Sequence, residues 1–155
     1  MELDIKIMEA SPQLIAAVRA SVPRGGIAET FGQSLDQVWA FLRRHQHLHA
    51  GGHHLFLYEH DSLQPPLLRV DFGVQVVARF EQEGEVRCVE VPGGEVVSTV
   101  YRGPYARLPG AHAAVHDWCR RHARQIGAFS WEIYGDWSAD ETKLETTLVY
   151  ALQPV

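Results

Sequence analysis

The sequence feature that most constrains the fold is a match between two segments that lie far apart in the chain. Residues 38–45 read VWAFLRRH and residues 115–122 read VHDWCRRH, and both have apolar positions at helical spacing. Each segment follows an extended segment and a loop rich in Gly and Pro, and each precedes two further extended segments. A repeated order of elements indicates a duplicated supersecondary unit, whose apolar helix face must be covered by a sheet. The sequence therefore predicts two βαββ halves in tandem.

Each half is predicted to contain one helix. The first begins at Ser34, because Ser34 and Gln37 have the spacing of a capping box, and it ends before Gly51. The second begins near Pro109, which suits the first turn of a helix, and it is ended by Gly127. Its inner stripe is expected to contain Ala111, Val115, Trp118, Cys119, His122 and Ile126.

The remaining apolar segments have the period or the composition of strands. The first of them, over residues 2–19, is expected to have a kink at Ser11 and Pro12, and the third is expected to be broken in its pairing near Gly73. The predicted strands are 2–19, 53–60, 68–80, 86–91, 95–101, 129–134 and 144–152. The predicted turns between strands are 61–66, 81–85 and 92–94, the last of which reads as an ordinary hairpin turn.

These elements define an α+β fold. The chain has 155 residues, enough for one domain with a proper core, and we expect a single domain over 1–155 with halves over approximately 1–80 and 86–155. If the halves are related by a pseudo-twofold axis, both helices lie on one face of an antiparallel sheet. The expected ligand groove then lies on the opposite face, where the halves meet.

The segment 129–134, FSWEIY, places a carboxylate inside an aromatic and β-branched run. Alternation along a strand puts Glu132 on one face with Ser130 and Tyr134. The other face is expected to be core and consists of Phe129, Trp131 and Ile133. An unpaired ionised carboxylate is costly to bury. Glu132 is therefore at the surface, paired within the protein, or directed at a cationic or hydrogen-bonding partner, and the pattern leaves these three alternatives open.

Charge and composition exclude several functions. The net charge is −5, and Lys and Arg are spread along the chain without a basic stripe, so we expect no direct nucleic-acid binding. The N-terminal residues have neither a basic end nor an apolar stretch of signal-peptide type, and no segment has the length of a membrane span. We therefore expect a cytoplasmic protein without membrane attachment. Cys88 and Cys119 lack CxxC spacing and are expected to be reduced.

Nine His residues raise the question of a metal site. Five of them crowd the end of the first predicted helix and the loop that follows, and His112 and His116 have i, i+4 spacing. The two Cys residues add no ligand pair, and His is also favoured near a helix C-terminus by the helix dipole. No residue is marked as an axial haem ligand. We expect no metal and no cofactor.

The chain contains RGPY at 102–105, the FxxExY pattern at 129–134 and LETTLVYAL at 144–152. Together these three motifs resemble the family of GyrI-like small-molecule-binding domains. With the tandem βαββ order, the resemblance covers essentially the whole chain. In this family the domain occurs fused to helix-turn-helix regions of the AraC and MerR types and also alone, as in DNA gyrase inhibitor proteins. The resemblance implies a standalone effector-binding member, because a chain of this length has no room for a fused DNA-binding region.

The resemblance implies a pocket acid on the strand after the second helix, and the matching position is Glu132. Alternation and topology add a set of aromatic companions, which are Tyr134, Tyr101, Tyr58, Phe56, Trp39 and Tyr150. Trp39 is also a candidate core residue, and Trp137 is either a lid over the pocket or a contact for a partner. An aromatic cage with one acid suits a hydrophobic or cationic small molecule and discriminates poorly among such ligands. The ionisation state of Glu132 is left open, because burial and partners act in opposite directions.

Three functions compete. The first is a binding module that senses effectors or sequesters drugs. The second is a hydrolase of cyclopropane-containing xenobiotics, as in some standalone members of the family, with Glu132 as the catalytic general acid or base. The third is an interaction protein for DNA gyrase or a regulator, suggested by the turn at 92–95, which falls where the gyrase inhibitor has a Gly-Gly turn.

Overall fold

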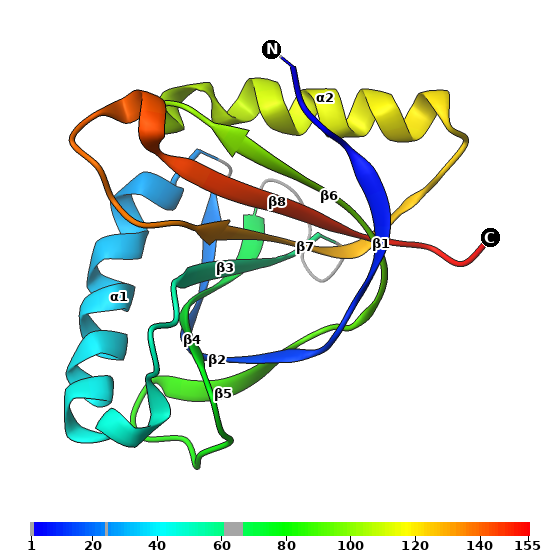
Figure 1. Ribbon diagram of the computed structural model, residues 1–155. Helices are drawn as coiled ribbons and strands as arrows, with labels where there is room; N and C mark the ends of the chain where they lie inside the picture. Colours follow the sequence, from blue (N-terminus) through cyan, green and yellow to red (C-terminus); the bar gives the residue numbers. More distant parts are fainter. Residues whose placement is uncertain (1, 24, 61–66) are drawn as a thin grey trace.

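The computed structural model describes residues 2–23, 25–60 and 67–155, which form an α+β fold with one eight-stranded sheet and two long helices (Figure 1). The order of the long elements is β1 (Lys6–Ala10), β2 (Gln13–Pro23), α1 (Ile27–Arg44), β3 (His54–Glu59), β4 (Leu67–Val76), β5 (Val86–Val91), β6 (Gly94–Arg102), α2 (Leu108–Arg121), β7 (Ile126–Tyr134) and β8 (Glu145–Leu152). Three short 3₁₀ helices are η1 (Gln46–Leu48), η2 (Tyr105–Arg107) and η3 (Glu141–Lys143). The predicted turn over 61–66 lies outside the described residues.

The strands pair antiparallel in the order β1-β6-β8-β7-β3-β4-β2-β5. The strands that flank α2 pair as β6-β8-β7, and those that flank α1 pair as β2-β4-β3. The pair β3 and β7 joins these two units at the centre of the sheet. That the units are copies related by a pseudo-twofold axis stays a prediction.

The first predicted strand is in fact two strands at distant places in the sheet. β1 pairs with β6 at one edge, while β2 pairs with β4 and β5 near the other edge, so the kink predicted at Ser11 and Pro12 is a change of strand partner. The turn at 92–94 is likewise not a hairpin, because β5 and β6 do not pair with each other. A Cβ on Gly93 would lie 2.6 Å from Cδ of Pro12. The absence of a side chain at Gly93 therefore permits the turn at Pro12 to contact the turn at Gly93.

The predicted break at Gly73 is wrong. The register between β2 and β4 runs without interruption from Leu14 opposite Val76 to Pro23 opposite Leu67. A Cβ on Gly73 would lie 2.9 Å from the carbonyl oxygen of Ala16, so the missing side chain allows β2 and β4 to approach closely. β4 also ends at Val76 and does not extend to residue 80.

The first helix begins at Ile27, well before the predicted start at Ser34. Ser34 is 5% exposed and lies inside α1, so its apparent capping box with Gln37 is wrong. The apolar stripe that drives the helix starts earlier, with Ile27 and Phe31, and both face the cavity described below. Capping spacing alone did not locate the N-terminus, because Ser and Gln also occur inside helices.

The second helix ends at Arg121 and not at Gly127. Ala123 has a φ of 55° and donates its N–H to the carbonyl oxygen of Arg120 at 3.2 Å. The N–H of Arg124 bonds the carbonyl oxygen of Cys119 at 2.9 Å, which completes a Schellman motif. Ile126, predicted in the helix stripe, therefore begins β7.

Ala123→Gly is expected to raise the free energy of unfolding by about 1 kcal/mol, because a side chain disfavours the left-handed backbone region. The matched control is Ala113→Gly, which removes an exposed Ala from the interior of α2 and should cost about 1 kcal/mol. Urea unfolding measures both changes. Equal destabilisation by the two substitutions would contradict the assigned cap.

Both helices cover the same face of the sheet (Figure 1). α1 packs with Phe56 and Tyr58 of β3, and α2 packs with Leu148 and Tyr150 of β8. The opposite face forms a closed apolar core as the sheet curls, with Trp131 at 2% exposure and Phe129 and Ile133 beside it. Its other fully or largely buried members are Ile15, Ala17, Leu55, Leu57, Val89, Val91, Val96 and Val149. The expectation of a ligand groove on this face is wrong, because apolar side chains fill it.

No helix in the described part of the chain is long and apolar enough to span a membrane.

Candidate functional site

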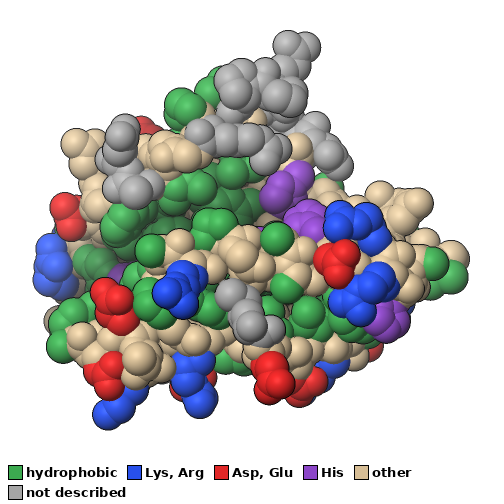
Figure 2. Space-filling view, turned by 90° about the horizontal axis from the view of Figure 1, so that it is seen from above, with side chains coloured by type: hydrophobic (Ala, Val, Ile, Leu, Met, Phe, Trp, Pro, Cys, Tyr) green, Lys and Arg blue, Asp and Glu red, His purple; other side chains and the backbone are tan. Residues whose placement is uncertain are grey.

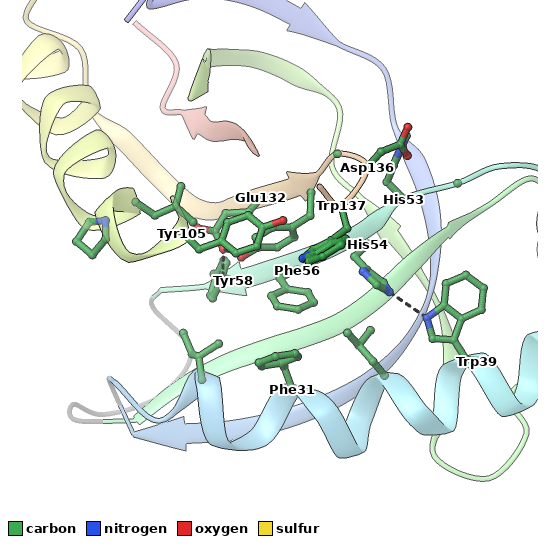
Figure 3. Close-up of a pocket in the computed structure, with 17 residues that line it drawn as sticks. Phe31, Trp39, His53, His54, Phe56, Tyr58, Tyr105, Glu132, Asp136 and Trp137 are labelled. Carbon is green, nitrogen blue, oxygen red and sulfur yellow. Dashed lines mark hydrogen bonds and ion pairs between the residues drawn. The ribbon is translucent and has the colours of Figure 1, made fainter. Parts of the chain in front are cut away.

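A cavity of about 810 Å³ lies on the helix-covered face, between α1 and the first turn of α2 and above β3 and β7 (Figure 3). The surface seen in Figure 2 is hollowed where hydrophobic side chains gather, with histidine side chains beside them. The residues that line the cavity are Ile27, Phe31, Leu35, Trp39, Gly52, His53, His54, Phe56, Tyr58, Tyr105, Leu108, Pro109, Glu132, Tyr134, Gly135, Asp136 and Trp137. The volume suits a drug-sized ligand.

Helical and strand periodicity explain this lining. α1 contributes one residue per turn, at positions 27, 31, 35 and 39, and β3 contributes every second residue, at positions 54, 56 and 58. In the register of β3 and β7, Phe56 lies opposite Glu132 and His54 lies opposite Tyr134. The cross-strand pairs therefore bring the acid into the middle of an aromatic floor.

Glu132 is buried at 8% side-chain exposure and makes three hydrogen bonds. Its Oε1 accepts the hydroxyl hydrogens of Tyr58 at 2.6 Å and Tyr134 at 2.7 Å. Its Oε2 lies 2.7 Å from Nε2 of His112, which comes from α2. The sequence left three alternatives open for Glu132. In the structure its carboxylate is paired within the protein.

His112 connects Glu132 to a second tyrosine. Its Nδ1 lies 2.6 Å from the hydroxyl of Tyr150. When Tyr150 donates to Nδ1, the imidazole is free to donate from Nε2 to Glu132, so each partner is satisfied by one ring tautomer. His112 on α2 and Tyr150 on β8 thereby hold the side chain of Glu132 in one rotamer.

The contacts of Glu132 determine its charge. Burial raises the pKa of Glu132, but the hydrogen bonds from His112, Tyr58 and Tyr134, together with the charge interaction with His112, outweigh burial and hold that pKa below the usual value of a glutamate. Burial, followed by the nearby Glu132 charge, raises the pKa of Tyr58 and of Tyr134, so both remain hydroxyl donors. The carboxylate is therefore ionised at neutral pH.

The lowered pKa of Glu132 predicts a specific acid dependence of stability. A carboxylate whose pKa is lower in the folded than in the unfolded state stabilises the fold above its unfolded pKa, and the contribution disappears as pH falls through the folded value. Wild type and Glu132→Gln should therefore differ most in free energy of unfolding near pH 7, and the difference should shrink as the pH falls below about 4.3, the ordinary pKa of a glutamate. Urea unfolding at a series of pH values measures it. A difference that stays constant over this range would contradict the assigned shift.

The structure brings five of the seven predicted site residues to the cavity: Glu132, Tyr134, Tyr58, Phe56 and Trp39. Tyr101 lies outside the lining, because it is on β6 beneath α2, where it is 4% exposed and its hydroxyl donates to the carbonyl oxygen of Pro104 at 2.8 Å. Tyr150 also lies outside the lining and is joined to Glu132 by hydrogen bonds through His112. The ligand-binding roles of the other five stay predictions.

Sequence reasoning missed several lining residues and the partner of the acid. Phe31 was missed because the start of the first helix was placed too late, and Tyr105 belongs to the RGPY motif but was not read as a site residue. His112 was noted only for its spacing to His116, which gives no sign of a contact to β7. Trp137 lines the cavity at 76% exposure, which favours the lid alternative over a remote contact.

Within residues 2–23, 25–60 and 67–155, no group of three or more His, Cys, Asp or Glu side chains is placed to hold a metal ion.

The chain belongs to the family of GyrI-like small molecule binding domains, whose family model matches residues 3–152. The C-terminal domain of EcmrR is similar in structure, with a TM-score of 0.73, 18% identity and coverage of 100% of both chains. SAV2435, solved bound to tetraphenylphosphonium, has a TM-score of 0.74 and 10% identity over 97% of this chain and 94% of that chain. A hydrolase from Listeria innocua has a TM-score of 0.67 and 12% identity over 96% and 91% of the two chains. Comparison with curated proteins gives no match.

Proposed function

We propose that the protein binds lipophilic cations in the cavity between α1 and α2, as an effector-sensing or drug-sequestering module. The observation that carries this proposal is the buried carboxylate of Glu132, held by three hydrogen-bond donors at the base of an aromatic cavity. A ligand cation that enters exchanges water for aromatic faces and a fixed negative charge. The proposed ligand-binding residues are Glu132, Tyr134, Tyr58, Phe56 and Trp39.

The charge of the lining supports a cation over an anion. The lining has two acidic residues, Glu132 and Asp136, and contains no Lys or Arg among the described residues. Asp136 lies at the exposed rim, 3.0 Å from Nε2 of His53, so Glu132 is the principal negative charge inside the cavity. The rings of Phe31, Phe56 and Tyr134 present apolar and π surfaces to a ligand.

The contacts of Glu132 favour binding over hydrolysis. A general base is most effective when its pKa lies near the working pH, whereas the pKa of Glu132 is held below that of an ordinary glutamate. Its three hydrogen-bond donors also stabilise the carboxylate against taking up a proton. A hydrolytic role for Glu132 is therefore the alternative outcome of the test and not the proposal.

The proposal includes an architecture for one domain over 1–155. The β2-β4-β3 and β6-β8-β7 units are taken as two copies of a βαββ unit, related by a pseudo-twofold axis. The central pair β3 and β7, where the two units join, supplies the acid and most of the aromatic floor. In this arrangement one site is expected at the junction of the two units.

Titration calorimetry with a matched pair of ligands tests the proposal. Methyltriphenylphosphonium supplies the cation, and triphenylphosphine oxide supplies a neutral ligand in which an oxygen replaces the methyl group. We expect the cation to bind at least tenfold more tightly, and mass analysis after incubation should recover it intact. Equal affinities would remove the electrostatic basis of the proposal. In a parallel incubation with a cyclopropane-bearing alkylator, recovery of that compound with one added water would make the protein a hydrolase. If no compound binds, a protein partner such as DNA gyrase or a regulator becomes the better hypothesis.

A further inference from the structure

We propose that the cavity also recognises a hydrogen-bond acceptor on its ligand, through the Nδ1–H of His54. The preferred ligands are then lipophilic cations that carry a carbonyl or ether oxygen at a fixed distance from the charge. This inference rests on the proposed function and narrows its ligand class. It also gives His54 and Trp39 a joint role in ligand selection.

The tautomer of His54 is fixed by Trp39. The indole Nε1–H of Trp39 can only donate, and it lies 2.9 Å from Nε2 of His54 (Figure 3). His54 must therefore accept at Nε2, so that its own ring proton is on Nδ1. The two rings meet edge to face at a centroid distance of 5.7 Å, which holds the imidazole in this orientation.

The imidazole of His54 is neutral in this arrangement. Burial, and then the neighbouring His53, lowers the pKa of His54 below that of an ordinary histidine. A neutral ring offers a hydrogen-bond donor without the positive charge that would repel a cationic ligand. His54 is thus compatible with the cation site at Glu132.

Among the described residues no acceptor is recorded for the Nδ1–H of His54, whose side-chain hydrogen bond and ring contact are both with Trp39. His54 is half-buried and lines the cavity. A ligand oxygen that accepts a hydrogen bond from this partly buried N–H replaces the water lost on binding and so stabilises the complex. The cavity therefore has an unused polar contact besides Glu132.

The sheet register sets the spacing of the two polar contacts. Phe56 lies opposite Glu132, and His54 is two residues further along β3, opposite Tyr134. Two residues of a strand span roughly 7 Å, about the length of one substituted phenyl ring. A ligand with its cation beside Glu132 can therefore lay an aromatic ring over Phe56 and present an oxygen to His54.

Two phosphonium ions that differ in one atom test this inference. The first is (4-acetylphenyl)triphenylphosphonium, with a carbonyl oxygen one ring away from phosphorus, and the second is the 4-isopropenyl analogue, in which a CH₂ group replaces that oxygen. Calorimetry should give a ratio of affinities of about threefold to tenfold in favour of the acetyl compound, the range expected of one hydrogen bond. In His54→Phe this ratio should fall to about one or below, whatever the absolute affinities become. The control is His47→Phe, an exposed substitution in η1 that should leave the ratio unchanged.

The outcomes separate the inference from the proposed function. If both phosphonium ions bind the wild type equally, or if the preference survives in His54→Phe, the His54 contact is overturned while cation binding stands. If neither ion binds, the proposed function fails, and the inference fails with it. Nitrogen-15 NMR of the unliganded wild type gives a second measurement that needs no variant. A ring proton on Nε2 of His54 in place of Nδ1 would overturn the inference.

Discussion

Glu132→Gln is expected to weaken tetraphenylphosphonium binding at least tenfold. Two unit charges about 5 Å apart interact by about 3 kcal/mol at an effective dielectric constant of about 20, and water in the cavity mouth reduces this value. Even half of that energy corresponds to about tenfold in affinity. Gln has nearly the same shape as Glu, so the aromatic contacts of the cavity remain available. Titration calorimetry at pH 7 measures the change.

A matched control separates the local charge from the net charge of the protein. Glu85→Gln removes one exposed carboxylate away from the cavity lining and should leave phosphonium affinity within twofold of wild type. The loss of binding affinity in Glu132→Gln should also be larger for the phosphonium than for neutral triphenylphosphine oxide. Equal losses for the two ligands would mean that the substitution damaged the shape of the cavity, and the electrostatic explanation would be wrong.

Arg19→Met is expected to lower the free energy of unfolding by about 3 kcal/mol. Asp71 has 5% side-chain exposure, and Arg19 lies directly opposite it in the register of β2 and β4. The guanidinium donates from Nε to Oδ1 at 2.9 Å and from Nη2 to Oδ2 at 3.0 Å. Without Arg19 a buried carboxylate loses both donors, which costs about 3–5 kcal/mol in buried pairs. The lower end of that range applies because Arg19 is 34% exposed.

Two comparisons test this explanation by urea unfolding. Arg79→Met removes an exposed partner of Glu90 and should cost less than about 1 kcal/mol, as surface pairs do. Replacing both members, as Arg19→Met with Asp71→Leu, should restore part of the loss, because no buried charge remains without a partner. If Arg19→Met and Arg79→Met have the same effect, burial of Asp71 does not determine the energy of its ion pair.

The periodicity of β7 is the part of the site that the sequence predicts best. Alternation correctly separates Trp131 in the core from Glu132 and Tyr134 on the polar face, since a strand of aromatic and β-branched residues has only two sides. The βαββ order of elements similarly leads to an antiparallel sheet with both helices on one face. Local patterns of this kind need no information about distant contacts.

Pairing between distant strands is what the sequence could not supply. Tyr101 and Tyr150 are aromatic and lie on strands, but their distance from Glu132 depends on the order of strands in the sheet and on α2. The contact of His112 with Glu132 joins residues on α2 and β7, and no spacing in the sequence encodes it. The cavity was placed on the wrong face because the sheet curls, so that one face closes into a core.

The ionisation of Glu132 also needed the structure. Burial and hydrogen bonding act on the pKa of Glu132 in opposite directions, and only the three donors in place reveal which prevails. The family resemblance indicates Glu132 as the candidate pocket acid, and its partners in the structure set the direction of its pKa shift.

A crystal structure with tetraphenylarsonium is the most direct test of cation binding at Glu132. Arsenic replaces phosphorus in a cation of the same shape and gives an anomalous signal that locates the charged centre independently of the rings. We expect one arsenic site inside the cavity between α1 and α2, beside Glu132, with phenyl rings against Phe56 and Tyr134. An arsenic site elsewhere on the protein, with the cavity empty, would contradict the account.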